Sequence, residues 1–140
     1  MNKFWLKDSD GCEENTSEAS LVSIVDDDFS VGRSTQRLLR SSGFRAAAFT
    51  SAEDFLKSGR VRETDCLLLD VRMPGVDGLE LQRRLREANC LPPTIFISAR
   101  ASEEEERRAL QAGAAAFLRK PVSKEKLLQA ILTALENPTN

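Results

Sequence analysis

The stretch LVSIVDDD, residues 21–28, indicates the fold, because a short apolar run ends there in three consecutive acids. A run that is apolar at nearly every position is typical of a strand buried on both faces of a parallel sheet. The same arrangement returns in CLLLD, residues 66–70, and two later apolar runs lead to Ser98 and Lys120. The sequence therefore predicts a parallel sheet that gathers polar residues where its strands end.

Five apolar segments alternate with five segments of helical periodicity, which predicts an α/β fold. The predicted strands are residues 21–25, 44–49, 66–69, 93–97 and 115–118. Three helices begin with a pattern that resembles a capping box, at Ser51–Asp54, Asp77–Glu80 and Ser102–Glu105. We assign residues 21–136 to one domain, residues 1–20 to a flexible acidic extension and residues 137–140 to a C-terminal tail.

The composition limits the chemistry that the chain can perform. Of its 140 residues, 41% are hydrophobic and 30% charged, and the formal net charge of −2 favours neither nucleic acid nor an anionic membrane as a partner. No apolar run approaches the roughly 20 residues that span a bilayer, so we expect a cytoplasmic protein. The chain has no histidine and no CxxC pair, which excludes serine–histidine catalysis and the usual zinc sites. Any chemistry must use carboxylates, hydroxyls, lysine or arginine.

Five polar residues follow the predicted strands: Asp26, Asp27, Asp70, Ser98 and Lys120. Because parallel strands end at one edge of a sheet, we expect these side chains to lie together. Three neighbouring carboxylates repel one another unless a cation lies among them, and an all-oxygen site suits Mg²⁺. A lysine and a hydroxyl beside the acids suit a phosphoryl group. The set therefore fits phosphoryl transfer to a carboxylate.

Four segments that contain these residues resemble the motifs of response-regulator receiver domains: VDDD at 25–28, LDVRMPG at 69–75, ISA at 97–99 and FLRKP at 117–121. The resemblance covers about residues 20–136, and its second segment is most similar to the FixJ-like branch. It implies a flavodoxin-like (βα)5 doubly wound sandwich with a five-stranded parallel sheet in the order 2-1-3-4-5. It also implies a phosphoacceptor switch, with assisted self-phosphorylation and autodephosphorylation, rather than an enzyme.

The resemblance gives each acid a role. Asp70 matches the residue that accepts the phosphoryl group from a phosphohistidine of a sensor histidine kinase. Asp26 and Asp27 match the acidic pair that holds Mg²⁺, or Mn²⁺ in its place, together with Asp70 and the backbone carbonyl of Arg72. Asp28, the third acid of the run, is expected to point outward.

Three further residues match the moving parts of the family's switch. Ser98 matches the hydroxyl that moves to bond the phosphoryl group. Lys120 matches the lysine that pairs with that group, before a cis peptide bond to Pro121. Phe117 matches the aromatic residue whose rotamer follows the hydroxyl, although a phenylalanine in a short strand is usually a core residue.

Two arginines border the predicted phosphorylation site. Arg72 and Arg100 lie two residues beyond Asp70 and Ser98. Side chains at such positions lie beside the attacking water, so we expect the two arginines to set the lifetime of the phosphoryl group. Either shielding the group or holding water is compatible with their charge.

The last two helices carry the predicted output surface. The acids at 103–106 are interpreted as a solvated helix face, paired with arginines four residues later. This fourth helix has little to bury, which favours it as a moving part. The last helix, from about residue 124 to 135, has a leucine-rich stripe wider than one sheet contact needs. We predict a dimer or partner surface on helix 4, strand 5 and helix 5.

Two other functions compete with the switch. A haloacid-dehalogenase-type phosphatase also places a nucleophilic aspartate after an apolar strand, but it needs a second acid where this chain has Arg72. A degenerate receiver would be a binding scaffold only, although no residue of the acid pocket is missing. No basic patch follows Leu135, so we expect no direct DNA binding by this chain. It is either a single-domain regulator or, as the FixJ-like motif favours, the receiver part of a longer transcription factor.

Overall fold

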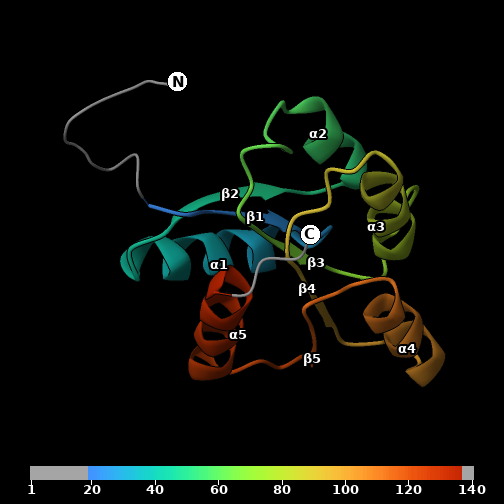
Figure 1. Ribbon diagram of the computed structural model, residues 1–140. Helices are drawn as coiled ribbons and strands as arrows, with labels where there is room; N and C mark the ends of the chain where they lie inside the picture. The colour runs from blue at the N-terminus through green and yellow to red at the C-terminus, as the bar shows by residue number, and fades with distance from the viewer. Residues whose placement is uncertain (1–18, 137–140) are drawn as a thin grey trace.

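Five strands and five helices alternate along residues 19–136, the part of the chain that the computed structural model describes (Figure 1). The strands are β1 Leu21–Val25, β2 Arg45–Phe49, β3 Cys66–Leu69, β4 Thr94–Ser98 and β5 Ala116–Arg119. The helices are α1 Phe29–Ser41, α2 Ala52–Lys57, α3 Gly78–Glu87, α4 Glu103–Gln111 and α5 Lys124–Glu136. The predicted alternation is confirmed, but β2, β4 and β5 each begin one residue later than predicted. The assigned tail, and all but residues 19 and 20 of the assigned extension, lie outside the described residues.

All five strands form one parallel sheet in the order β2-β1-β3-β4-β5, which confirms the predicted fold. Every residue of the neighbouring strands β1 and β3 is buried, because helices cover the sheet on both sides, and the buried hydroxyl of Ser23 in β1 is hydrogen-bonded to that of Thr64 at 2.7 Å. Val25 of β1 lies beside Leu69 of β3 in the register. The residues that follow these two strands therefore leave the sheet side by side.

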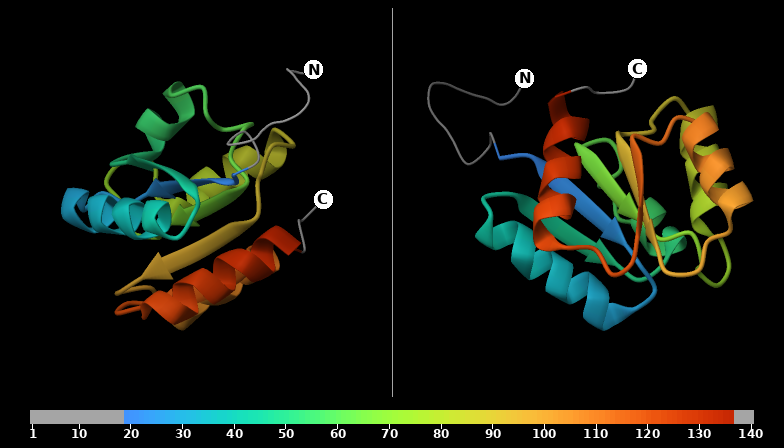
Figure 2. Two further views of the ribbon diagram at one scale, coloured as in Figure 1. Left: turned by 90° about the vertical axis from the view of Figure 1, so that its left-hand side faces the viewer. Right: turned by 90° about the horizontal axis from the view of Figure 1, so that it is seen from below.

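The helices form a layer on each face of the sheet (Figure 2). α1 and α5 cover one face, where Leu39 and Ile131 are fully buried in a cluster with Ile24. α2, α3 and α4 cover the other face, over a cluster that contains Phe55. Burying a large apolar side chain stabilises a fold by roughly 1.5–3 kcal/mol. α4 contributes only Ala109 to the fully buried set, so its apolar anchoring is the weakest of the five helices.

Side-chain caps fix where the first four helices begin. Asp28, Ser51, Asp77 and Ser102 each accept a hydrogen bond from the backbone N–H three residues later. Asp28 is exposed, as expected, and its carboxylate caps α1. The reciprocal bond that completes a capping box is present only at Ser102. The boxes predicted for α2 and α3 are thus only half formed.

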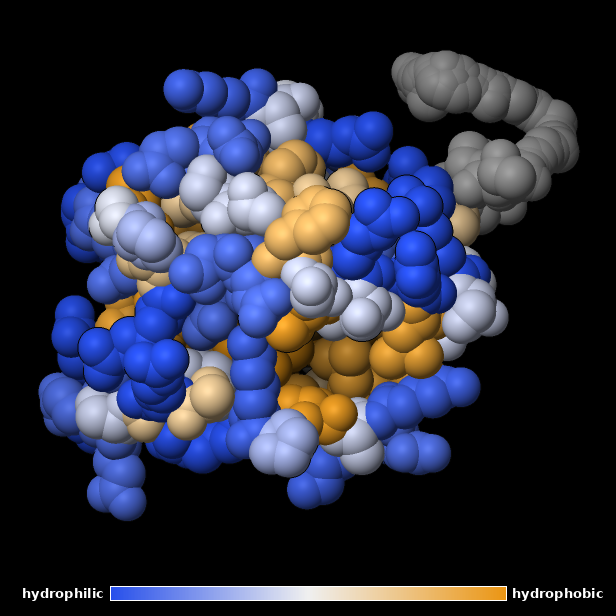
Figure 3. Space-filling model, turned by 180° about the vertical axis from the view of Figure 1, so that it is seen from behind, coloured by the Kyte–Doolittle hydropathy of each residue, from blue (hydrophilic) through white to orange (hydrophobic). Residues whose placement is uncertain are grey.

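Charged residues dominate the outer surface. Figure 3 shows one face, on which hydrophobic residues form a patch surrounded by hydrophilic ones. Among the described residues, four large hydrophobic side chains are exposed: Phe29, Val31, Leu110 and Leu132. Within residues 19–136, no helix is long and apolar enough to cross a membrane.

Candidate functional site

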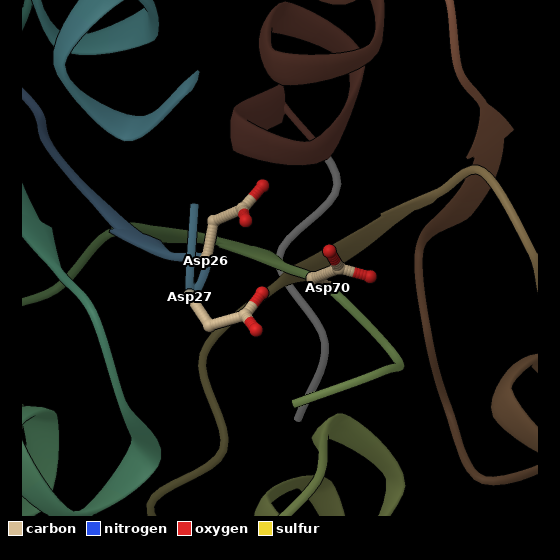
Figure 4. A group of neighbouring side chains, drawn as sticks. All are labelled: Asp26, Asp27 and Asp70. Carbon is tan, nitrogen blue, oxygen red and sulfur yellow. The ribbon is translucent and has the colours of Figure 1, made fainter. Parts of the chain in front are cut away.

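Three carboxylates meet where β1 and β3 end. Asp26 and Asp27 follow β1 directly, and Asp70 follows β3. The backbone N–H of Asp70 donates to the carbonyl oxygen of Val25, 3.0 Å away, which ties the two strand ends together. One carboxylate oxygen of each acid lies within 4.8 Å of those of the other two (Figure 4). The sheet register therefore assembles the acidic group that the sequence pattern indicates.

Burial makes this group electrostatically unfavourable unless its charge is compensated. Asp26 and Asp70 are only 6% and 9% exposed, whereas Asp27 is exposed. Burial raises the pKa of the Asp70 carboxyl above its usual value, and the charge of Asp26 adds to the effect. The charge of Lys120 and the backbone N–H of Arg72 act in the opposite direction, without cancelling the rise. A cation beside the three oxygens would stabilise their ionised forms.

Lys120 reaches the acids from the end of β5. Its Nζ donates to Oδ2 of Asp26 at 3.0 Å and to Oδ2 of Asp70 at 3.3 Å. Burial alone would lower the pKa of Lys120, but the hydrogen bonds and charges of these two acids raise it above its usual value. The peptide bond from Lys120 to Pro121 is cis. Three carboxylates and one ammonium leave an excess of two negative charges, which a divalent cation would neutralise.

Ser98 completes the pocket from the end of β4. It is 1% exposed, and its hydroxyl oxygen accepts the backbone N–H of Arg100 at 3.3 Å. Its carbonyl oxygen accepts the backbone N–H of Lys120 at 3.1 Å, so the serine and the lysine are held beside each other. Both line a pocket of about 640 Å³ together with the three acids. Carboxylates, an ammonium and a hydroxyl thus line one cavity, a combination of groups that suits the binding of a phosphoryl group.

Gly78, the first residue of α3, supports the site and was not identified from the sequence. Its backbone N–H donates to the carbonyl oxygen of Val71 at 3.0 Å. A Cβ atom at this position would lie 2.2 Å from the backbone oxygen of Asp70, a distance that no side chain tolerates. Only glycine therefore lets α3 approach the end of β3. The sequence signal that could have pointed to Gly78 is the pair Asp77-Gly78, in which a helix cap is followed by a residue with low helix propensity.

Phe117 is half-buried in β5, between the core and the surface. Its ring stacks on Phe96 with 5.8 Å between the centroids, and the Arg119 guanidinium lies 5.4 Å from the ring centroid. The same guanidinium donates to the carbonyl oxygen of Ala101 at 2.6 Å and to Glu106 of α4 at 2.7 Å. Phe117 therefore lies under an arginine that connects β5 to α4.

The arginines predicted to border the site both line its pocket. Arg72 also pairs with Glu105 of α4, with Nη2 and Oε1 2.8 Å apart. This contact corrects the interpretation of residues 103–106 as a solvated face, because two of the four acids bind arginines from other elements. The predicted pairing with arginines four residues later is also wrong, since Glu104 pairs with Arg107.

Comparison with known proteins gives consistent matches. A family model described as the response regulator receiver domain matches residues 22–132. The chain is 40% identical over 126 residues to nodulation protein W of Bradyrhizobium diazoefficiens, covering 90% of this chain and 56% of that protein. It is 41% identical over 120 residues to the transcriptional regulatory protein TdiR of Thauera aromatica, covering 86% and 53%. The chain therefore spans just over half the length of these curated relatives.

Among solved structures, the crystal structure of FixJ-N superimposes with a TM-score of 0.78 at 31% sequence identity. The match covers 88% of this chain and 98% of that one. The agreement extends across nearly all of FixJ-N, so the two chains share the fold.

Proposed function

The chain belongs to the family of response regulator receiver domains, and we propose that it controls a signalling output through reversible phosphorylation of Asp70. Receiver domains are signalling switches of two-component systems that interact with sensor kinases, and they are not enzymes of the classical kind. One observation carries the proposal: Lys120 bonds both Asp26 and Asp70 in a pocket that a third acid completes. This arrangement holds a nucleophile and a cationic phosphoryl ligand at adjacent positions.

The acids fit a magnesium ion, which receiver domains generally bind at an acidic pocket. The fit rests on the donor set, because hard carboxylate oxygens, two of them buried, are the ligands that Mg²⁺ prefers. We assign Asp26, Asp27, Asp70 and the backbone carbonyl of Arg72 as its ligands, and Mn²⁺ as a substitute. When bound, the ion would offset the negative charge on the phosphoryl oxygens.

In the proposed transfer, a carboxylate oxygen of Asp70 attacks the phosphorus atom of a phosphohistidine on a sensor kinase. The O–P bond forms as the N–P bond breaks, and the imidazole nitrogen keeps the electron pair and takes a proton from solvent. Lys120 can hold a phosphoryl oxygen because its Nζ is already 3.3 Å from Asp70 Oδ2, and the Ser98 hydroxyl can donate a hydrogen bond. Attack by water later breaks the O–P bond and releases inorganic phosphate.

Phosphorylation would change the surface formed by α4, β5 and α5. Movement of the Ser98 hydroxyl toward the phosphoryl group would vacate space for the ring of Phe117, which is half-buried next to Phe96. The surface also exposes Leu110 and Leu132, at 43% and 53%. A homodimer or a partner protein would bury these leucines, so the proposal includes an interaction through this surface.

The proposed output is transcription, through a DNA-binding domain that is not part of this chain. The support is that TdiR is a transcriptional regulator and that this chain covers 53% of its length. The chain itself has a net charge of −2, which does not favour direct DNA binding. We also propose that the phosphotransfer from a sensor kinase takes place in the cytoplasm.

The test is the intact mass of the protein after incubation with acetyl phosphate, with and without Mg²⁺. We expect a gain of one phosphoryl group that requires Mg²⁺ and is lost in Asp70→Asn. Asp54→Asn is the matched control, because Asp54 is an exposed acid of α2 that does not line the pocket. If the mass did not increase under any condition, the chain would be a binding scaffold rather than a phosphorylated switch. Rapid release of free phosphate would indicate a phosphatase instead.

A further inference from the structure

Arg72 links the proposed phosphoacceptor to α4. Its backbone N–H donates to Oδ1 of Asp70 at 3.2 Å. Its guanidinium donates through Nη2 to Oε1 of Glu105 in α4 at 2.8 Å. One residue thus contacts both the carboxylate that would carry a phosphoryl group and a helix of the proposed output surface.

Glu105 is the residue that closes the N-terminus of α4. Its Oε1, the atom bound by Arg72, also accepts the backbone N–H of Ser102 at 2.9 Å. In return, the Ser102 hydroxyl accepts the backbone N–H of Glu105 at 3.1 Å. The hydrogen bond from the Ser102 backbone, together with the charge of Arg72, holds the pKa of Glu105 below its usual value. Arg72 therefore binds α4 through the ionised group that defines its first turn.

Polar contacts hold most of α4 in place. Ala109 is its one fully buried residue, and the buried amide of Gln82 donates to the Ala109 carbonyl oxygen at 3.0 Å. Glu106 pairs with Arg119 of β5 at 2.7 Å. Moving the N-terminus of α4 would break such polar contacts without exposing a large apolar surface. Exchange of the Arg72 partner is therefore energetically feasible.

We propose that the Arg72 side chain is a positioning residue that exchanges Glu105 for the phosphoryl group when Asp70 is phosphorylated, and thereby releases the N-terminus of α4. The proposal rests on the proposed function. A phosphoryl group brings more negative charge than a carboxylate and offers several oxygens to the planar guanidinium. Arg72 lines the same pocket as Asp70, only two residues away, so its side chain is placed to make this exchange.

Arg100, which follows the neighbouring strand β4, provides a contrast. It lines the same cavity, but within residues 19–136 its guanidinium forms no ion pair. Arg100 can contact a phosphoryl group without releasing another partner. Of these two arginines, Arg72 is the one that would transmit phosphorylation to α4 by giving up an existing contact.

The exchange has a thermodynamic consequence. If the Arg72–Glu105 pair exists only in the unphosphorylated state, then removing it must favour the phosphorylated state by the free energy of the pair. The Arg72 and Glu105 side chains are 57% and 21% exposed, which places the pair among the weak surface ion pairs. The expected gain in affinity for a phosphoryl mimic is therefore about two- to fivefold.

The test measures the affinity of the Mg²⁺-loaded protein for beryllofluoride, a tetrahedral mimic of the phosphoryl group, by isothermal titration calorimetry. Glu105→Gln should bind it about two- to fivefold more tightly than wild type. Glutamine can still close the capping box, so α4 should remain folded. Glu104→Gln, the control, makes the same charge change in the same turn but removes only the local pair with Arg107. It should bind like wild type.

A double-mutant cycle with Arg72→Met separates the exchange from general electrostatics. In the Arg72→Met background, Glu105→Gln should no longer change the affinity. Equal affinities of the Glu105→Gln and Glu104→Gln variants would overturn the proposal, as would a gain that persists without Arg72. Failure of wild type to bind beryllofluoride with Mg²⁺ would instead reject the phosphorylation site itself, together with the exchange.

Discussion

The close approach of α3 to Asp70 makes Gly78→Ala the most informative single substitution. The new Cβ would lie 2.2 Å from the backbone oxygen of Asp70 and 3.1 Å from a ring carbon of Phe96. Cβ atoms essentially never come within 3.0 Å of a non-bonded heavy atom, so the backbone at residue 78 and the backbone at Asp70 must move apart by about 0.8 Å or more. The phenylalanine ring restricts where the methyl group can go. The first turn of α3 must therefore move away from the end of β3.

The cost follows from two opposing effects. Overpacking of this kind typically destabilises a protein by about 1–3 kcal/mol. Replacing glycine by alanine in a helix returns up to about 1 kcal/mol through helix propensity. Because the clash is with backbone rather than with a flexible side chain, the overpacking cost falls in the upper part of its range, about 2–3 kcal/mol. After the gain in helix propensity we expect Gly78→Ala to lower the free energy of unfolding by about 1–2 kcal/mol, which shifts the urea midpoint down by roughly 0.5–1 M for a typical slope of about 2 kcal/mol/M. The clash is with the backbone of Asp70 itself, so part of the adjustment falls on the end of β3. The resulting displacement of Asp70 should slow phosphorylation by acetyl phosphate by an order of magnitude or more.

Gly32→Ala is the matched control, because it is the same substitution in α1. A Cβ at Gly32 would meet the Cβ of Ala48 at 3.7 Å, an ordinary van der Waals contact. This variant should be more stable than wild type by up to about 1 kcal/mol and should be phosphorylated at the wild-type rate. If Gly78→Ala unfolded at the same urea concentration as wild type, the close approach of α3 would not constrain the site as argued.

Three further predictions test other parts of the molecule. Lys120→Ala should still accept a phosphoryl group slowly, as intact mass can show, but should fail to signal. In this variant phosphorylation should leave the hydrogen exchange of the α4 amides unchanged; a wild-type change in α4 exchange would contradict the role of Lys120 in signalling. Burial raises the pKa of Cys66 to about 12, so at pH 8 iodoacetamide should label Cys90, which is half-exposed, long before Cys66, as peptide mass spectrometry can measure. Equal labelling rates in the native protein would be inconsistent with this burial. Hydrogen bonds from Arg83 and Arg84 lower the pKa of Glu80 to about 2, so its stabilising contribution is present above pH 4.5 and is lost as the pH falls toward 2. Thermal melts from pH 7 to pH 2.5 should therefore show a smaller acid-induced loss for Glu80→Gln than for wild type.

The strand-end acids could be predicted because burial alone determines where they lie. β3 is apolar throughout and β1 at every position but Ser23, so both are expected inside the sheet, and parallel pairing then brings Asp26 and Asp70 to one edge. Ser98 and Lys120 follow from the same reasoning. This step needs no knowledge of the helices, whose packing is harder to infer from a sequence.

The helix caps show where local patterns are insufficient. Glu80 is placed three residues after Asp77, which is the spacing of a capping box. Its carboxylate instead bonds Arg83 and Arg84 on the surface of α3. The two arrangements differ little in free energy, since each exchanges one exposed polar contact for another. The sequence contains both possibilities and does not rank them.

The same competition explains why the role of Glu105 could not be predicted. A solvated acid near a helix N-terminus and an acid bound to a distant arginine have the same local sequence. The choice depends on the position of α4 relative to Arg72, and the side chains of residues 33 positions apart meet only once the sheet has formed. Because α4 buries so little apolar surface, these ion pairs help to decide where it lies. The weak apolar anchoring that could be predicted is thus the physical reason that a single arginine can influence the position of this helix.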